Sequence, residues 1–357
     1  MKNGLTLFIT GGAGYVGVML ADQFSKRADV KEVICLDKEN QPKILIGNPK
    51  IFWITANTSD GSWQEIVRKK SPQIIIHTAW QIRELYRKQK IQWQWNVLGS
   101  QAVFDLAFSL SSVKKLIHFS TVASYGAQPK NDINYRFLET ESLRESDYLY
   151  AEQKHVVENR LRSTYEASKI KKNITPTVFI IRPVGITGPR GRYGRDNFSL
   201  QSALSGSLRG KKSFLYSLIS WWVTLVPVTR KWLRQYVHED DIVDIVELLA
   251  FKEICSSYEI FNAAPPGPPL LGPDMARAVG KKMILVSPWM VRLAFFLMWH
   301  VTQGRIPTAR GIWKCYCYPI AVDGSKISKQ YGYQYAHESL EAFVKVVGRY
   351  QDSFNNK

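Results

Sequence analysis

The chain has 357 residues, of which 45% are hydrophobic and 22% are charged. This is the composition of an ordinary globular protein, long enough for two lobes around a cleft, and it excludes a largely disordered chain. The formal net charge of +18 arises from 48 Lys and Arg against 30 Asp and Glu. Such an excess favours anionic partners, and dinucleotides, nucleotide-sugars, acidic lipid surfaces and nucleic acid all qualify.

The cysteines and the N-terminus bear on the compartment. Four cysteines are too few and too unevenly spaced for a disulfide framework, and they lack the spacing of metal ligands. We therefore expect reduced thiols, no metal site and a cytoplasmic protein. The N-terminus runs directly into an apolar strand pattern, so we expect no signal peptide.

The predicted elements alternate from the start of the chain. An apolar run at 5–10, helical spacing at 15–25 and a second apolar run at 33–37 form a βαβ unit. The pattern continues with strands at 51–55, 73–77, 115–120 and 177–181 and with helices at 63–70, 96–109 and 148–167. This order predicts a Rossmann-type doubly wound parallel sheet, in which ligands bind at the carboxyl ends of the strands.

The regularity falls after Arg182-Pro183, where glycines mark loops and a smaller α+β lobe is expected to begin. Two apolar stretches lie beyond that point. Residues 213–229 carry no charge, and residues 286–301 contain one arginine. Both are short of the roughly 20 apolar residues that span a bilayer. We therefore expect buried helices, a lid over a hydrophobic substrate, or an interfacial helix lying on a membrane.

A glycine motif follows the first predicted strand. Gly11, Gly14 and Gly17 permit a sharp turn, a close backbone approach to a pyrophosphate, and tight packing of the next helix. Asp37 ends the second strand, where a carboxylate accepts hydrogen bonds from an adenosine ribose. The carboxylate of Asp37 favours NAD over NADP, although the neighbouring Lys38 weakens this preference.

A second motif carries acid/base chemistry. Tyr150 and Lys154 are four residues apart, so both side chains lie on one face of the predicted helix. An ammonium near the phenol favours the phenolate and moves its pKa from about 10 toward neutral pH. The pair is therefore predicted to act as a general acid/base.

Together these motifs resemble the extended branch of the short-chain dehydrogenase/reductase superfamily, specifically its NAD-dependent epimerase/dehydratase family. The resemblance covers nearly the whole chain. Further matching segments are residues 75–79 (IIHTA), 96–100 (NVLGS), 119–126 (FSTVASYG), 182–189 (RPVGITGP), 236–241 (YVHEDD) and 259–262 (EIFN). Their order and rough spacing are those of the family.

The resemblance implies a catalytic set in which Thr121 replaces the family's serine, Tyr150 is the acid/base and Lys154 lowers its pKa. It implies that Asn57 and Thr58 contact adenine. The complete expected NAD-binding set is Gly11, Gly14, Tyr15, Val16, Gly17, Asp37, Lys38, Asn57, Thr58, Thr78, Ala79, Asn96, Tyr150, Lys154, Pro183 and Val184.

The expected substrate-binding set is Trp80, Thr121, Gly185, Arg234 and Arg310. By the same resemblance, Arg234 falls where nucleotide-sugar enzymes bind the diphosphate, and Arg310 is a candidate second phosphate contact. Two members depart from the family pattern. Trp80 stands where a small residue is usual, and Gly185 stands where an asparagine usually holds the substrate.

These observations predict an NAD-binding domain from residues 1–182 and 233–262, and a substrate-binding lobe from 183–232 and 263–357. The leading hypothesis is an NAD-dependent enzyme that oxidises a secondary alcohol of a nucleotide-sugar. Dehydration is disfavoured because Val122 and Ala123 stand where dehydratases carry an acidic pair.

Two alternatives remain open at this stage. Gly185 and the uncharged stretch 213–229 would suit a 3β-hydroxysteroid dehydrogenase-like enzyme acting on a hydrophobic alcohol. The high positive charge would suit a noncatalytic RNA- or membrane-binding protein on the same fold. The expected partner is a small-molecule substrate; a homodimer and a peripheral membrane contact are left open, and nucleic acid is not expected.

Overall fold

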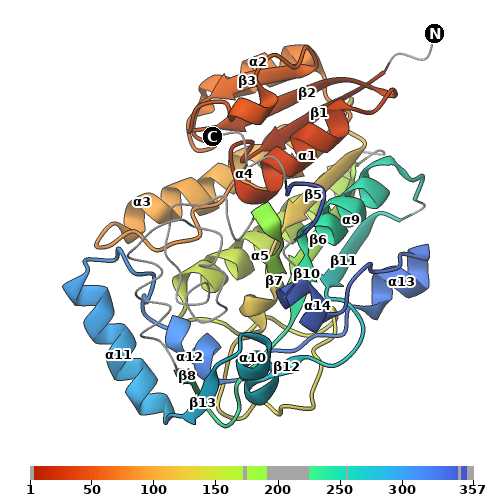
Figure 1. Cartoon of the computed structure of the whole chain (residues 1–357). Coiled ribbons are helices and arrows are strands. Elements are labelled where there is room, and N and C mark those ends of the chain that lie inside the picture. The colour runs from red at the N-terminus through yellow and green to blue at the C-terminus, as the bar shows by residue number, and fades with distance from the viewer. Residues whose placement is uncertain (1–3, 172–174, 191–224, 255, 345–346, 352–357) are drawn as a thin grey trace.

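The computed structural model describes residues 4–171, 175–190, 225–254, 256–344 and 347–351. Its centre is a parallel sheet of seven strands in the order β11-β6-β5-β4-β1-β2-β3 (Figure 1). The strands are β1 (Leu5–Thr10), β2 (Val30–Asp37), β3 (Ile51–Thr55), β4 (Ile74–His77), β5 (Lys115–Phe119), β6 (Thr177–Pro183) and β11 (Tyr258–Ala263). The predicted doubly wound parallel sheet is confirmed.

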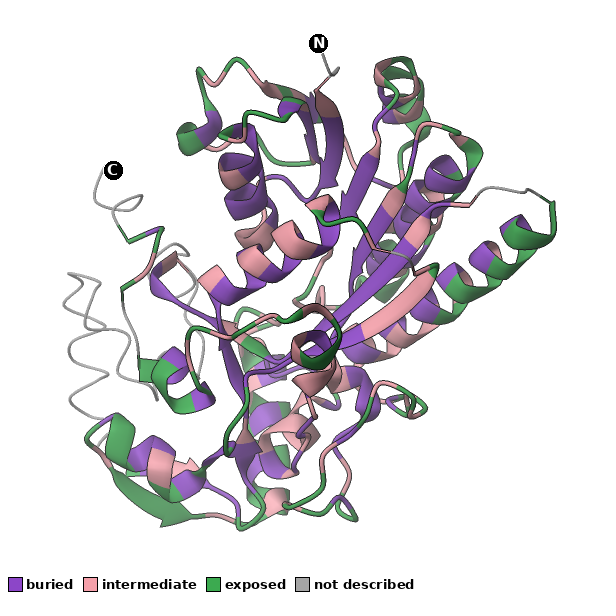
Figure 2. Cartoon of the chain, turned by 90° about the vertical axis from the view of Figure 1, so that its right-hand side faces the viewer, coloured by how far each residue is buried: buried purple, intermediate pink, exposed green. Residues whose placement is uncertain are grey.

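Helices cover both faces of this sheet because successive strand side chains point to opposite faces. Leu7 and Ile9 of β1 pack with α1 (Tyr15–Ser25) and α9 (Glu239–Phe251), whereas Phe8 faces the opposite core. That second core contains α2 (Gln64–Lys70), α4 (Gly99–Ser109) and α5 (Leu149–Lys171). Figure 2 shows the central strands largely buried.

Irregular segments join these elements near the carboxyl ends of the strands. The short α3 (Gln89–Trp93) continues into a π-helical turn at Gln94–Leu98 before α4 begins. Single 3₁₀ turns occupy Lys43–Leu45, Gly61–Trp63 and Val122–Tyr125. π-helical turns are rare and occur frequently at functional sites, and this one contains the predicted site residue Asn96.

The C-terminal half adds three pairs of short strands. β7 (Gly185–Thr187) pairs with β10 (Tyr236–His238), β9 (Leu233–Arg234) with β12 (Leu270–Leu271), and β8 (Leu225–Val228) with β13 (Lys282–Leu285). The helices of this half are α10 (Gly272–Ala278), α11 (Pro288–Val301), α12 (Ile312–Cys317), α13 (Ser325–Tyr331) and α14 (Ser339–Val344). The division of the chain into an NAD-binding domain and a substrate lobe stays a prediction.

The two apolar stretches of the sequence differ in how much of each the structure describes. Most of residues 213–229 lies outside the described residues, and only its end forms β8. Residues 286–301 contain α11, which confirms a helix there. Within the described ranges, no helix has both the length and the apolar character needed to cross a bilayer.

Candidate active site

A cleft lies at the carboxyl ends of the central strands and encloses about 1040 Å³, counting open solvent at its mouth. The predicted site residues that line it are Gly11, Gly14, Tyr15, Val16, Asp37, Lys38, Asn57, Thr58, Thr78, Ala79, Trp80, Asn96, Tyr150, Lys154 and Pro183. The structure therefore brings most of the predicted set together in one place.

The glycine turn has no room for side chains. Gly11 has φ of 75°, a conformation that favours glycine, and a Cβ there would lie 2.7 Å from the backbone nitrogen of Ala79. A Cβ on Gly17 would lie 2.0 Å from the carbonyl oxygen of Gly11. No side chain among the described residues caps the N-terminus of α1. Bare backbone facing a helix N-terminus fits the pyrophosphate of NAD.

Asp37 shapes this turn as well as lining the cleft. Its two carboxylate oxygens accept hydrogen bonds from the backbone N–H groups of Ala13 and Glu39, each at 3.0 Å. Each oxygen retains a further lone pair for a ribose hydroxyl. The ammonium of Lys38 lies 4.5 Å from the ring centre of Trp95, another lining residue.

Asn96 organises the cleft wall from inside the π-helical turn. Its side chain accepts a hydrogen bond from the backbone N–H of Gln81 at 2.8 Å and donates one to Gln153 of α5 at 2.7 Å. The hydroxyl of Thr78 donates to the carbonyl of Thr10 at 2.6 Å. These side chains tie the loop after β4 to the neighbouring elements.

The predicted acid/base group lies at one end of the cleft. Burial raises the pKa of Tyr150, and a side-chain hydrogen bond with Thr121 opposes that rise. Thr121 precedes the 3₁₀ turn Val122–Tyr125, and its hydroxyl also accepts a hydrogen bond from the backbone N–H of Ala123 at 3.2 Å. The structure thus joins Thr121 to Tyr150, as expected from the sequence.

Lys154 is held by contacts with a backbone carbonyl and an aromatic ring. Its ammonium donates to the carbonyl of Phe119 and lies 3.6 Å from the ring centre of Trp80. Burial lowers the pKa of Lys154 well below its usual range. In this structure burial raises the pKa of Tyr150, and the expected lowering of that pKa by Lys154 stays a prediction.

Trp80 contacts both Lys154 and Tyr150. Its ring covers Lys154 and meets the ring of Tyr150 edge-on, with 6.4 Å between centres. The indole Nε1 is buried and has no hydrogen-bond partner among the described residues. Buried donors normally have partners, so this N–H is an exception among the described residues.

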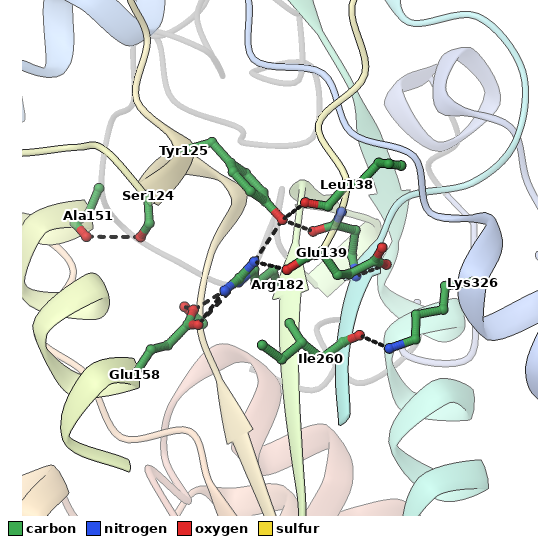
Figure 3. Close-up of polar contacts among 11 residues, drawn as sticks. Ser124, Tyr125, Leu138, Glu139, Ala151, Glu158, Arg182, Ile260 and Lys326 are labelled. Carbon is green, nitrogen blue, oxygen red and sulfur yellow. Dashed lines mark hydrogen bonds and ion pairs between the residues drawn. The ribbon is translucent and has the colours of Figure 1, made fainter. Parts of the chain in front are cut away.

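Sequence reasoning missed a buried network behind the catalytic end (Figure 3). The guanidinium of Arg182 contacts Glu158 of α5 at 2.6 Å and donates to the hydroxyl of Tyr125 at 2.8 Å. Glu158 also accepts a hydrogen bond from Ser120, which immediately precedes Thr121. The sequence did offer an indication of Glu158: it lies four residues after Lys154, so the two side chains share one face of the predicted helix.

Other lining residues also escaped prediction: Leu36, Ala56, Gln81, Ile82, Trp95, Phe119, Ser120 and Ile186. Conversely, several predicted residues lie outside the described lining: Gly17, Thr121, Val184, Gly185, Arg234 and Arg310. Gly17 contributes indirectly, because its lack of a side chain permits the tight glycine turn between β1 and α1. The backbone N–H of Val184 donates to the carbonyl of Ala263 at 3.2 Å, at the edge of the main sheet.

Gly185 and the two arginines lie farther toward the C-terminal half. A Cβ on Gly185 would lie 2.9 Å from the ring of Tyr236, so this ring excludes a side chain. Arg234 is half-buried, 5.5 Å from the ring centre of Trp232, and forms no ion pair with a described residue. Arg310 is 86% exposed in its side chain and pairs with Asp147 at 2.7 Å.

The sheet, the glycine turn and the cleft define a dinucleotide-binding enzyme of the Rossmann class. The model of the NAD dependent epimerase/dehydratase family matches residues 7–264, and the chain belongs to this family. The predicted family, enzyme class and NAD cofactor are confirmed.

Individual relatives are more distant. A dTDP-D-glucose 4,6-dehydratase from Dictyostelium discoideum is 26% identical over 274 residues, which are 71% of this chain and 57% of that protein. The chain therefore spans little more than half the length of this relative. The solved UDP-glucose 4-epimerase of Thermotoga maritima, determined with UDP-glucose, has a TM-score of 0.69 at 19% identity and covers 98% and 99% of the two chains.

The Bordetella bronchiseptica enzyme WbmG, solved with NAD and UDP, has a TM-score of 0.68 at 17% identity. The match covers 99% of this chain and 95% of that one. At these identities the two structures show the shared fold, which agrees with the sheet described above.

Proposed function

We propose that this protein is an NAD-dependent enzyme that oxidises a secondary alcohol on the sugar of a nucleotide-sugar, with Tyr150 as the acid/base. The placement of Tyr150 and Lys154 in the lining of the cleft, with Thr121 hydrogen-bonded to Tyr150, carries this proposal. The family model supports the reaction class, and the relatives named above support the substrate class.

The chain's own residues supply the proton steps. The hydroxyl of Thr121 orients the substrate oxygen, and the phenolate of Tyr150 accepts its proton. NAD, when bound, supplies the hydride acceptor. Lys154, which lines the same cleft, is the proposed source of positive charge for the phenolate.

The rate of oxidation should depend on pH in a defined direction. Because burial raises the pKa of Tyr150, the phenol is protonated at neutral pH, and the reactive phenolate forms only as the pH rises. We expect kcat/KM for oxidation to increase from neutral toward alkaline pH. A profile that falls over this range would contradict Tyr150 as the base.

Arg234 is the proposed diphosphate contact. It is a half-buried arginine that forms no ion pair with a described residue, and its guanidinium suits bidentate recognition of phosphate oxygens. Arg310, in contrast, already pairs with Asp147 on the surface. We expect Arg234→Met to weaken binding of UDP or a UDP-sugar by about tenfold or more, the effect of a lost charge-assisted contact. Arg310→Met, the matched control, should bind nearly as wild type.

We propose epimerisation or net oxidation rather than dehydration. Val122 and Ala123 follow Thr121, and neither has the carboxyl group needed to move a proton during elimination. An epimerase returns the hydride and shows no net absorbance change at 340 nm, whereas a dehydrogenase accumulates NADH.

The decisive experiment identifies the nucleotide bound to the purified protein and screens UDP-sugars, dTDP-sugars and hydroxysteroids with wild type and Tyr150→Phe. We expect turnover of a nucleotide-sugar by the wild type and a loss of at least about a hundredfold in Tyr150→Phe, the usual contribution of a general acid/base. Undiminished turnover in the variant would refute the mechanism. Turnover of hydroxysteroids alone would refute the substrate class while retaining the mechanism.

A further inference from the structure

The outer face of α11 is apolar but has no partner among the described residues. The inner face of this helix packs through Val291 and Phe295 against α12, and its Trp299 contacts Tyr86 with 5.5 Å between ring centres. The large apolar side chains of the outer face are between 45% and 80% exposed: Trp289, Met290, Leu293, Phe296, Leu297 and Val301. A surface helix of a water-soluble protein normally carries polar residues on that face.

This surface, called here the α11 face, continues into the preceding strand. All four residues of β13 are exposed, and three of them, Met283, Ile284 and Leu285, are large and apolar. Figure 1 shows α11 along the outer edge of the C-terminal half, away from the central sheet. The exposed apolar side chains therefore belong to one segment of the chain, which runs from β13 through α11.

The segment of sequence that contains the α11 face is rich in cations, of which Arg277, Arg310 and Lys314 pair with Asp274 or Asp147. Between Asp274 and Asp323 the sequence contains no Asp or Glu but has seven Lys and Arg residues. Lys282, Arg292 and Arg305 are exposed, and none of them belongs to an ion pair among the described residues. A protein partner of mixed surface charge gains little from such a surface, whereas an anionic lipid surface complements it.

We propose that the α11 face docks the protein onto the surface of an anionic lipid bilayer, with the apolar side chains in the headgroup region and the surrounding cations against acidic headgroups. The 14 residues of α11 extend about 21 Å, short of the roughly 30 Å hydrocarbon core, so the helix lies on the membrane. Trp289 and Phe296 are residue types that favour this interface. The proposal is independent of the proposed catalytic function.

The end of α11 also contacts the rim of the cofactor cleft. The hydroxyl of Tyr86 lies 3.2 Å from Nδ1 of His300, and Gln81 and Ile82, a few residues before Tyr86, line the cleft. A docked protein would therefore carry out its reaction close to the bilayer.

Sedimentation of the full chain with vesicles tests the proposal. We expect co-sedimentation with vesicles of equimolar phosphatidylcholine and phosphatidylglycerol, weaker binding to phosphatidylcholine alone, and release at high salt. The double variant Trp289→Ser/Phe296→Ser should lose at least about tenfold in partitioning. The control Ile170→Ser removes an isolated apolar side chain that is 87% exposed at the end of α5 and should bind as wild type.

The variants change exposed side chains, and circular dichroism verifies that they fold. Absence of binding to the mixed vesicles, or equal binding by the double variant and the wild type, would overturn the proposal. Sedimentation velocity in the absence of lipid tests a second copy of the chain as the occupant. A wild-type dimer that the double variant abolishes would also overturn it.

Discussion

The buried pair of Glu158 and Arg182 offers a sharp test of how the active-site scaffold is held. Their side chains are 5% and 4% exposed, and the guanidinium contacts Glu158 through both Nε and a terminal nitrogen, at 3.0 and 2.6 Å. Glu158→Gln retains the shape of the side chain but removes its charge. The change leaves a buried guanidinium without a compensating carboxylate.

Breaking a buried pair in this way costs about 3–5 kcal/mol. The same helix contains a matched control in the pair of Arg162 and Glu166, which are 3.8 Å apart and each 52% exposed. Glu166→Gln should cost no more than about 0.5 kcal/mol, the contribution of a solvent-exposed helical pair. Urea denaturation, with both variants compared to wild type at pH 7, measures the free energies of unfolding.

A loss of less than about 1 kcal/mol in Glu158→Gln would refute this reasoning, because an unpaired buried charge must cost more than a neutral hydrogen bond. The double variant Glu158→Leu/Arg182→Met separates charge from packing. It should be more stable than Glu158→Gln, since it buries no unpaired charge.

Further predictions concern the turn and the core. Gly17→Ala should cost about 1–3 kcal/mol of stability and weaken NAD binding in calorimetry, because a Cβ at this position has no room. Gly61→Ala is the control: a Cβ there meets nothing within 4 Å, so neither stability nor NAD binding should change. His118 is buried with no partner for either ring nitrogen among the described residues, and burial lowers its pKa well below 6.5. As the pH falls below about 6.5, the side chain of His118 takes up a proton in the unfolded chain but not in the folded one. The free energy of unfolding therefore declines with acidification. His118→Leu should gain about 1 kcal/mol at pH 7 and weaken this decline between pH 7 and 5; an unchanged slope in urea denaturation would contradict the assignment.

Six strands of the sheet were predictable because each contains an apolar run next to a segment of helical spacing, whereas β11, with Glu259 and Asn262 in its six residues, was not predicted as a strand. The strand at 51–55 and the helix at 15–25 agree with the structure in their bounds. The pairs of two to four residues in the C-terminal half were not predictable. A strand such as β9, with two residues, is too short to show any periodicity and depends on its partner β12 for its conformation.

The predictability of the site residues depended on their sequence context in the same way. The glycine turn and Asp37 were identifiable because they stand at fixed positions after two strands that the sequence itself predicts. Arg182 and Glu158 are 24 residues apart and meet only because β6 and α5 pack together. The contact of Lys154 with Trp80 likewise joins α5 to the loop after β4, 74 residues earlier in the chain.

The two departures from the family pattern have physical causes that only the folded chain reveals. Gly185 stands where an asparagine is usual because the ring of Tyr236 occupies the space of its side chain. Trp80 stands where a small residue is usual, and its ring contacts both Lys154 and Tyr150. In both places an aromatic ring stands where the family resemblance led us to expect a different side chain, so we expect substrate recognition to rely more on ring faces and less on side-chain amides. Sugar rings and other partly apolar alcohols suit such surfaces, which is why the substrate screen spans both classes.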